Sequence, residues 1–173
     1  MSKVKLVEPS AAFRDSYLEM LEEWRQANEK MVPFVLKMDS EDFGKMLKEL
    51  RGYEEGIGIP DSFVPHSTYW LADEEDSIVG AVNIRHHLND NLLAIGGHIG
   101  YGVRPGARKK GYASEMLRLA LEKTREMGLS KVLVTCNKDN IGSAKTILNN
   151  GGKLESEFQE ENGNIVQRYW IEL

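Results

Sequence analysis

The chain has 173 residues, with 22 Lys and Arg against 27 Asp and Glu, and a formal net charge of −5 at pH 7. This length suits one domain that buries its own core, and the single cysteine excludes an internal disulfide framework or a four-thiolate zinc site. The acidic charge argues against general nucleic-acid binding, and the sequence contains neither a membrane-length apolar run nor a signal-peptide pattern. We therefore expect a soluble, cytoplasmic protein without a membrane or nucleic-acid partner.

The first part of the chain is predicted to contain one strand and two helices. Alternating apolar residues over 3–8 predict a short strand that ends at Pro9. Apolar residues at helical spacing then predict a helix that ends near Asn28 and that Ser10 is placed to cap. A second helix is expected over about 40–50, and the glycines and prolines of 52–65 predict an irregular loop.

The remainder alternates strands and helices. Strands are predicted over 68–72, 77–86 and 92–103, followed by a helix over 113–127. A short apolar strand over 131–136, a small helix over 143–149 and a hairpin of 153–158 with 165–173 complete the pattern. This order of elements predicts an α/β (α+β) domain with a mixed sheet. The stripe that we expect to be buried in the long helix comprises Met116, Leu117, Ala120, Leu121 and Thr124.

The most informative segment joins a strand to the long helix. It reads Val103-Arg104-Pro105-Gly106-Ala107-Arg108-Lys109-Lys110-Gly111-Tyr112-Ala113. The first amides of a helix have no internal partner and lie at the positive end of the helix dipole, so such a loop binds anions. Its two glycines have P-loop spacing, but Tyr112 and Ala113 stand where a P-loop needs Lys and then Ser or Thr. The segment is therefore predicted to bind a phosphate group without transferring it.

Arg108-Lys109-Lys110-Gly111-Tyr112-Ala113 matches the Arg/Gln-x-x-Gly-x-Gly/Ala signature of the GNAT superfamily of acyl-CoA-dependent N-acetyltransferases. The chain resembles this family from about residue 67 to 173, because Asn137, Asn140 and Ser143 resemble its second motif and Gly151-Gly152 stand where its strand-entry glycine falls. The resemblance implies a single domain over 1–173, with a core over 67–173 and a variable acceptor-side region over 1–66. It also implies a mixed central sheet of about six to seven strands, flanked by about four helices and splayed at the CoA site.

The resemblance implies a site for acetyl-CoA and none for a metal. Amides of the 108–113 segment would grip the pyrophosphate of CoA, and the edge of the strand that ends at Val103 would pair with the amides of pantetheine as an added strand does. Asn140 and Ser143 would contact the same arm. The residues expected to bind acetyl-CoA are Tyr101, Gly102, Val103, Arg108, Lys109, Lys110, Gly111, Tyr112, Ala113, Ser114, Asn137, Asn140 and Ser143.

The expected reaction is direct attack of a primary amine on the thioester while both substrates are bound. The amine must arrive neutral, which calls for a base that acts directly or through water. His98 and Tyr101 are the candidate catalytic residues; a hydrogen-bonded structural role for His98 and a packing role for Tyr101 are the alternatives. Many relatives carry a general-acid Tyr in the helix after Asn140, whereas the matching position here is Ile147 or a neighbour.

These features predict an N-acetyltransferase that moves an acetyl group from acetyl-CoA to a primary amine of a small molecule or peptide, as a monomer or homodimer. The missing Tyr keeps a second interpretation open, a catalytically idle acyl-CoA-binding sensor or regulatory module. A nucleic-acid binder built on the basic loop is a third interpretation, which the net charge opposes. A cationic acceptor would be favoured if the acceptor cleft were ringed by the acidic residues Glu19, Glu22, Glu23, Asp39, Glu41, Asp42, Glu54 and Glu55.

Overall fold

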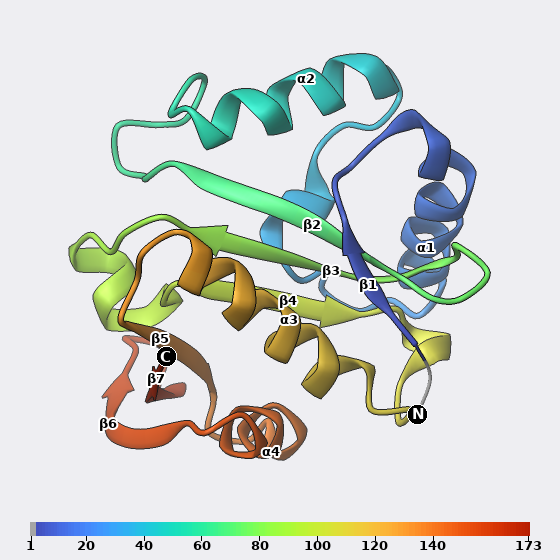
Figure 1. The fold of residues 1–173 in the computed structure, drawn as a ribbon. Helices are drawn as coiled ribbons and strands as arrows, with labels where there is room; N and C mark the ends of the chain where they lie inside the picture. The colour runs from blue at the N-terminus through green and yellow to red at the C-terminus, as the bar shows by residue number, and fades with distance from the viewer. Residues whose placement is uncertain (1–2) are drawn as a thin grey trace.

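The computed structural model describes residues 3–173, whose seven strands form two adjoining sheets (Figure 1). The first sheet is antiparallel and has the order β1 (Lys5–Val7), β2 (His66–Ala72), β3 (Ile78–Arg85) and β4 (Ile99–Val103). The second is also antiparallel and has the order β5 (Lys131–Asn137), β7 (Ile165–Glu172) and β6 (Lys153–Gln159). The predicted mixed fold is confirmed, but its strands divide between two sheets.

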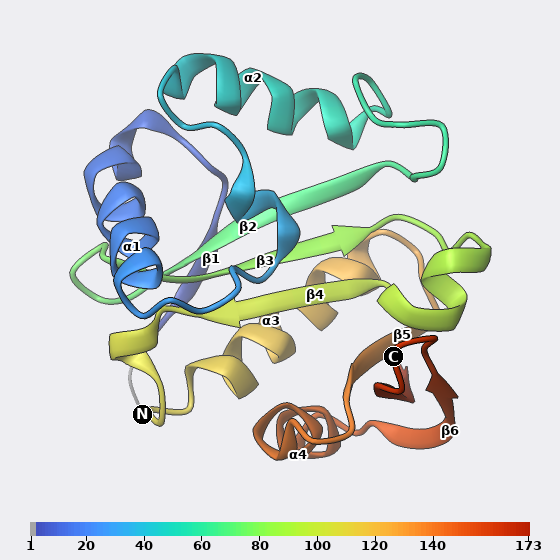
Figure 2. The ribbon, with the colours of Figure 1, turned by 180° about the vertical axis from the view of Figure 1, so that it is seen from behind.

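Helices cover both faces of the first sheet. Helix α3 (Tyr112–Glu126) lies over one face, with α4 (Ile141–Asn149) beside the second sheet (Figure 1). Helices α1 (Arg14–Gln26) and α2 (Phe43–Glu54) and the short 3₁₀ helix η2 (Phe34–Lys37) lie over the other face, which Figure 2 shows from behind. Within residues 3–173, no helix is both long enough and apolar enough to cross a lipid bilayer.

An apolar core fills each side of the first sheet. On the α3 side, the predicted stripe of that helix is buried, and it packs against apolar residues of β3, β4 and β5. On the α1 side, Tyr17 stacks on Trp70 with ring centroids 4.1 Å apart, and the apolar face of α2 closes over them. The two cores fix the sheet from both sides and so position the ends of β4 and β5.

A side-chain cap starts α2, whereas the cap predicted for the first helix is absent. Helix α2 begins after Asp42, whose carboxylate accepts a hydrogen bond from the Lys45 amide at 3.1 Å. Ser10 was predicted to cap the first helix, but its side chain makes no capping hydrogen bond. A 3₁₀ turn over Ala11–Phe13 comes first, and α1 begins at Arg14.

The strand predicted over 92–103 is wrong in its first half. Residues Leu92–Gly96 form a π-helical turn, η3, and only Ile99–Val103 form a strand. The Asn89 side chain accepts a hydrogen bond from the Leu92 amide at 2.9 Å, which starts the turn. Gly97 then adopts a φ of +67°, and a Cβ there would lie 2.6 Å from the Leu133 carbonyl oxygen. The turn therefore ends in a close backbone approach to β5 that only glycine permits.

The two sheets meet at His98 and separate beyond it. The His98 amide donates to the Leu133 carbonyl at 2.8 Å, and the Leu133 amide donates to Nδ1 of the His98 ring at 2.9 Å. The chain returns along α3 from the end of β4 to the start of β5, so these two strands run in the same direction (Figure 1). Because no ladder joins β4 to β5 in the described chain, the predicted splay of the central strands is confirmed.

Candidate functional site

A cleft of about 630 Å³ opens where β4 and β5 separate. Its walls come from the end of β4, the loop before α3, the first turn of α3, the length of α4, and the end of α1 with the segment that follows it. Eleven of the thirteen predicted cofactor contacts line it. They are Tyr101, Gly102, Val103, Arg108, Lys109, Gly111, Tyr112, Ala113, Ser114, Asn140 and Ser143.

The loop before α3 presents free backbone amides to this cleft. Gly111 is the residue before the helix and has a φ of +81°, and a Cβ there would have nothing within 4 Å. Within residues 3–173, none of the amides from Arg108 to Ser114 donates a hydrogen bond, and no side chain caps the helix. Unpaired amides at the positive end of a helix dipole form an anion site. The geometry agrees with the phosphate site that the sequence predicts.

Arg108 is not a free cation in this loop. Its Nη1 lies 2.8 Å from Oε1 of Glu29, its Nε donates to the Val103 carbonyl at 3.3 Å, and its guanidinium lies over the Trp24 ring. The side chain therefore ties the loop to the segment that follows α1. Lys110, also predicted to bind cofactor, does not line the cleft.

A carboxylate fixes the start of the same loop. Glu23 on α1 accepts a hydrogen bond from Nε of Arg104 at 2.5 Å and another from the Gly106 amide. Burial raises the pKa of Glu23, but these two hydrogen bonds and the neighbouring positive charges outweigh it, so the pKa lies below its usual range. Glu23 remains ionised and positions the turn that precedes the free amides.

Tyr101 reaches across the cleft from β4 to the start of α4. Its hydroxyl lies 3.2 Å from Oγ of Ser143, whose amide donates to the Asn140 side chain at 3.1 Å. Burial raises the pKa of Tyr101 to about 12, so the phenol keeps its proton at neutral pH. Ile147, the position where relatives carry a general-acid Tyr, is fully buried in the core. The hydroxyl near the start of α4 therefore comes from a different element than the resemblance implies.

The placement of His98 favours its structural alternative. The side chain is 5% exposed, does not line the cleft, and uses Nδ1 to accept the Leu133 amide. Burial, with the nearby charges of Arg85 and His87, lowers the pKa of His98 to about 4, so the ring is neutral at pH 7. Asn137 is also outside the cleft, because its side chain accepts a hydrogen bond from Asn164 at 2.9 Å.

The sequence did not point to the lining residues that come from the end of α1 and the segment after it. Trp24, Glu29, Lys30 and Val32 line the cleft, and the Val32 carbonyl lies so close to Gly102 that a side chain there would collide with it. None of the acidic residues singled out in the sequence lines the cleft; among the lining residues of the described chain, Glu29 alone carries a carboxylate. No local pattern could have shown this contact, because it joins residues about 70 positions apart.

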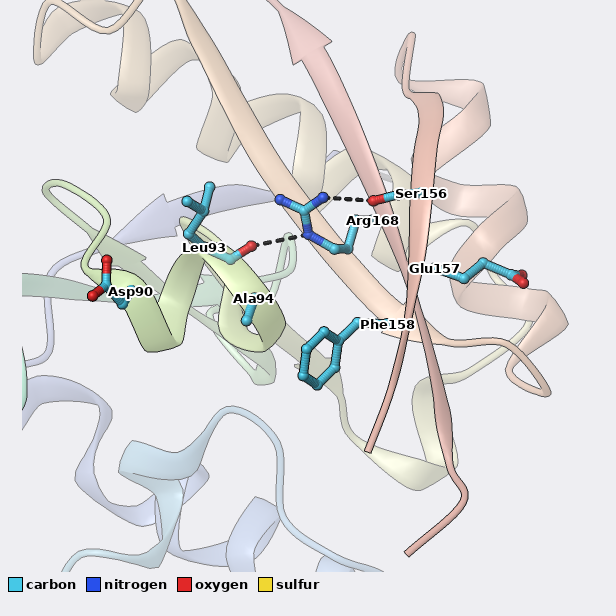
Figure 3. A pocket seen from close by; sticks show the side chains of 7 residues that line it. All are labelled: Asp90, Leu93, Ala94, Ser156, Glu157, Phe158 and Arg168. Atoms are coloured by element: carbon cyan, nitrogen blue, oxygen red, sulfur yellow. Dashed lines mark hydrogen bonds between the residues drawn. The ribbon is translucent and has the colours of Figure 1, made fainter. Parts of the chain in front are cut away.

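A smaller hollow of about 250 Å³ lies between η3 and the β6–β7 hairpin (Figure 3). Arg168 crosses it from β7: its Nε donates to the Leu93 carbonyl at 2.9 Å, and its Nη1 donates to Ser156 Oγ at 2.6 Å and to Glu155 at 2.5 Å. This guanidinium is therefore satisfied by the protein, and it attaches the hairpin to η3. In the part of the chain that the structure describes, no group of three or more His, Cys, Asp or Glu side chains is arranged to bind a metal ion.

Residues 9–153 match the family model described as an acetyltransferase (GNAT) domain. The chain belongs to the GNAT acetyltransferase family. The GNAT match begins well before residue 67, so it includes α1 and α2, which the sequence analysis had placed in a variable region.

Among curated proteins, the GNAT chain is 28% identical over 88 residues to the "Uncharacterized N-acetyltransferase YnaD" of Bacillus subtilis (strain 168). That alignment covers 50% of this chain and 49% of the relative, so it spans about half the length of that protein. Among solved structures, an acetyltransferase of Salmonella typhimurium that modifies the N-terminal serine of ribosomal protein L7/L12 has a TM-score of 0.70 at 12% identity, covering 98% of this chain and 95% of that one. The microcin C7 self-immunity acetyltransferase MccE, solved with acetyl-CoA and AMP, has a TM-score of 0.69 at 16% identity. The match covers 99% of this chain and 93% of that one. These structures share the GNAT fold with the chain.

Proposed function

We propose that this GNAT protein transfers an acetyl group from acetyl-CoA to the primary amine of a small molecule or peptide while both substrates are bound. The observation that carries the proposal is the row of unpaired amides from Arg108 to Ser114, which opens onto the cleft between the splayed strands. Family membership and the acetyl-CoA found with a protein of the same fold support it.

The residues of the cleft fit the parts of acetyl-CoA. The free amides around Gly111 suit a pyrophosphate, because they combine hydrogen-bond donors with the positive end of α3. Among residues 3–173, the edge of β4 that faces β5 has no strand partner, and this free edge suits the amide groups of pantetheine. Acetyl-CoA, when bound, supplies the acetyl thioester.

The chemistry then requires little of the protein beyond positioning and charge stabilisation. The neutral amine nitrogen forms a bond to the thioester carbonyl carbon, the carbon–sulfur bond breaks, and sulfur leaves as a thiolate while the surplus proton of the nitrogen passes to water. We expect Tyr101 to donate a hydrogen bond to the departing sulfur. A phenol with a pKa of about 12 keeps its proton beside a thiolate whose conjugate thiol has a pKa of about 8.5. We assign His98 a positioning role at the junction of the sheets.

A second candidate function is the idle acyl-CoA-binding sensor. The buried Ile147 favours it, because no acidic group occupies the usual position on α4. Tyr101 argues against it, since this residue brings a hydroxyl to the start of the same helix. Release of CoA thiol from acetyl-CoA across a panel of primary amines distinguishes the two: a sensor binds acetyl-CoA and releases none.

The cofactor site is tested by the melting temperature with and without acetyl-CoA, which stabilises the folded state by mass action. We expect Gly111→Asp to abolish the rise, because its carboxylate would face the pyrophosphate. Gly128→Asp is the matched control: Gly128 also has a positive φ (+88°) with nothing within 4 Å, but it follows the far end of α3. Both variants strain a left-handed position by about 1–2 kcal/mol. Equal rises in wild type and Gly111→Asp would show that the site is misplaced.

A further inference from the structure

A buried polar patch lies on the sheet face that η2 and α2 cover. It comprises His66 and Thr68 of β2 and Asn83 and Arg85 of β3, each at most 8% exposed. The register pairs His66 with Arg85 and Thr68 with Asn83, so the four side chains share one face. Next along the sheet, Gly100 of β4 stands opposite Asn83 and has no side chain to cover them.

Two members of this patch have unsatisfied polar atoms. Nε of Arg85 and Oδ1 of Asn83 are buried and have no hydrogen-bond partner in the described chain. Nη1 of Arg85 donates to the Gly96 carbonyl at 3.2 Å, and no carboxylate among residues 3–173 lies within 4.0 Å of the guanidinium. Burial lowers the pKa of Arg85 to about 10, and burial and Arg85 together lower the pKa of His66 to about 4. Arg85 is therefore the charged member of the patch.

A buried guanidinium without a counter-charge is costly, and proteins almost always pair such groups. The other arginines near the site follow that rule: Arg104 pairs with Glu23, and Arg108 with Glu29. Arg168, which crosses the smaller hollow beside η3, pairs with Glu155. Arg85 differs from these three arginines, because no carboxylate of residues 3–173 pairs with it.

The guanidinium does not line the cleft itself, but it lies beside the part of β4 that leads into the cleft. A Cβ on Gly100 would be 3.1 Å from Nη2 of Arg85, and the next two residues of β4, Tyr101 and Gly102, line the cleft. The ring of Phe34 lies 5.6 Å from Cζ of Arg85, two residues after Val32, which lines the cleft as well. Phe34 is 42% exposed, so a side chain that reaches solvent forms part of the cover over Arg85. This is the face opposite α3, on the side away from the free amides.

We propose that Arg85 binds an oxyanion, a carboxylate or phosphate ester, carried by the amine that this enzyme acetylates. The proposal rests on the proposed function and specifies its acceptor. The oxyanion supplies the missing counter-charge and pairs with a planar guanidinium in a fixed orientation. The amine then points toward Tyr101 and the end of the pantetheine arm. Arg85 is a binding and specificity residue in this scheme.

The test compares acceptors that differ in the oxyanion alone. Thiol release from acetyl-CoA is measured for wild-type protein with amino acids against their primary amides, and with phosphoethanolamine against ethanolamine. Rates are expressed per neutral amine, because an oxyanion alters the pKa of a nearby amino group. We expect kcat/KM to favour the anionic member of at least one pair by about 10- to 100-fold, the range of a hydrogen bond to a charged group. The pair that shows the preference identifies carboxylate or phosphate as the source.

Three variants distinguish loss of oxyanion binding by Arg85 from a structural change in η3. Arg85→Gln should remove the preference by lowering kcat/KM for the anionic acceptor, and Arg85→Lys should restore part of it. Both Arg85 and Arg168 donate to carbonyls of η3, at Gly96 and Leu93, so Arg168→Gln tests whether loosening η3 suffices. We expect Arg168→Gln to keep the full preference.

The possible outcomes test the Arg85 proposal and the transferase proposal separately. Equal kcat/KM for both members of every pair in wild type overturns the proposal, and so does an equal loss of preference in Arg168→Gln. If acetyl-CoA binds but no acceptor releases thiol, the transferase fails separately, and calorimetric binding of the same pairs to CoA-saturated wild type and Arg85→Gln replaces turnover. An unchanged affinity for the anionic member in Arg85→Gln then contradicts the oxyanion site. If acetyl-CoA does not bind, the cofactor proposal fails, and the same titrations on the free protein decide Arg85.

Discussion

Tyr101 brings a hydroxyl from a strand to the start of the neighbouring helix. Its backbone lies in β4, its hydroxyl lies 3.2 Å from Ser143 at the start of α4, and it lines the cleft. The β4 origin leaves Ile147 free to pack into the core. We therefore treat the Tyr101 hydroxyl as the donor that faces the departing sulfur.

Replacing Tyr101 with Phe removes that hydroxyl and keeps the ring. We expect kcat to fall by about 10- to 100-fold, because a hydrogen bond to a charged atom contributes about 1.5–3 kcal/mol. The KM for acetyl-CoA should change little, since the free amides of the 108–114 segment remain. Tyr169→Phe is the control: its hydroxyl donates to Gln167 at 2.8 Å and does not line the cleft. A Tyr101→Phe enzyme with full kcat would leave Tyr101 a packing residue.

At the scale of elements, His98 joins the two sheets at the point from which they diverge. Its neutral ring accepts the Leu133 amide, and its own amide donates to the Leu133 carbonyl. Losing the ring would leave a buried amide unpaired, which costs about 1–3 kcal/mol. The cleft depends on this junction, because the angle between β4 and β5 is set there.

The protonation of His98 links this junction to pH. Its folded pKa of about 4 lies below the value of about 6.5 for an unfolded histidine, so between these limits the unfolded chain binds more protons. This contribution to stability is complete above about pH 6.5 and is lost as the pH falls toward 4. His66 has a folded pKa of about 4 as well and adds a contribution of the same sign.

Between pH 6.5 and 4, we expect His98→Asn to take up roughly one proton fewer on unfolding than wild type does. The slope of its unfolding free energy against pH should therefore be smaller. The asparagine carbonyl can still accept the Leu133 amide, whereas His98→Ala should be less stable by about 1–3 kcal/mol at pH 7. Urea unfolding at several pH values measures both effects. An unaltered slope in His98→Asn would mean that folding does not lower the pKa of this ring.

The elements that local chemistry dictates were predictable, and those that depend on distant contacts were not. The stripe of α3 and the free amides before it follow from periodicity and from Gly111, and both are where the sequence places them. The apolar run that begins at Leu92 is compatible with either a strand or a helix. Thr135 Oγ1, which donates to the Ile95 carbonyl at 2.5 Å, comes from β5 and cannot be paired with η3 by inspection of the sequence.

The same distinction applies to the candidate site. Its proposed cofactor half is largely a continuous segment with a recognisable signature, and most of the residues expected there line the cleft; that they bind acetyl-CoA stays a prediction. The proposed acceptor half is assembled from η2, β3 and β4, and Arg85 appears in the sequence as one more residue at the end of a strand. Its lack of a counter-charge becomes visible only when the neighbouring elements are folded around it.

At the scale of the whole molecule, β4 and the 108–114 segment leave a line of backbone groups beside the cleft without partners among residues 3–173. The interior strands β2 and β3 are hydrogen-bonded on both sides, whereas β4 has a free edge and the 108–114 segment has free amides. Free amides exchange with solvent without any unfolding, while those of β2 and β3 exchange only when the sheet opens. A ligand that binds along this line should therefore slow the exchange of the free amides more than that of the β2 and β3 amides.

Hydrogen exchange with and without saturating acetyl-CoA measures that difference. We expect the 108–114 segment and the edge of β4 to change from fast to slow exchange, because ligand atoms become partners of these amides. The β2 and β3 amides should slow only to the extent that acetyl-CoA raises the free energy of global unfolding, a shift that the melting temperature reports independently. In Gly111→Asp, both changes should disappear, whereas Gly128→Asp should retain both. Protection spread evenly along the chain, with the 108–114 segment still fast, would place the ligand elsewhere than on the free amides.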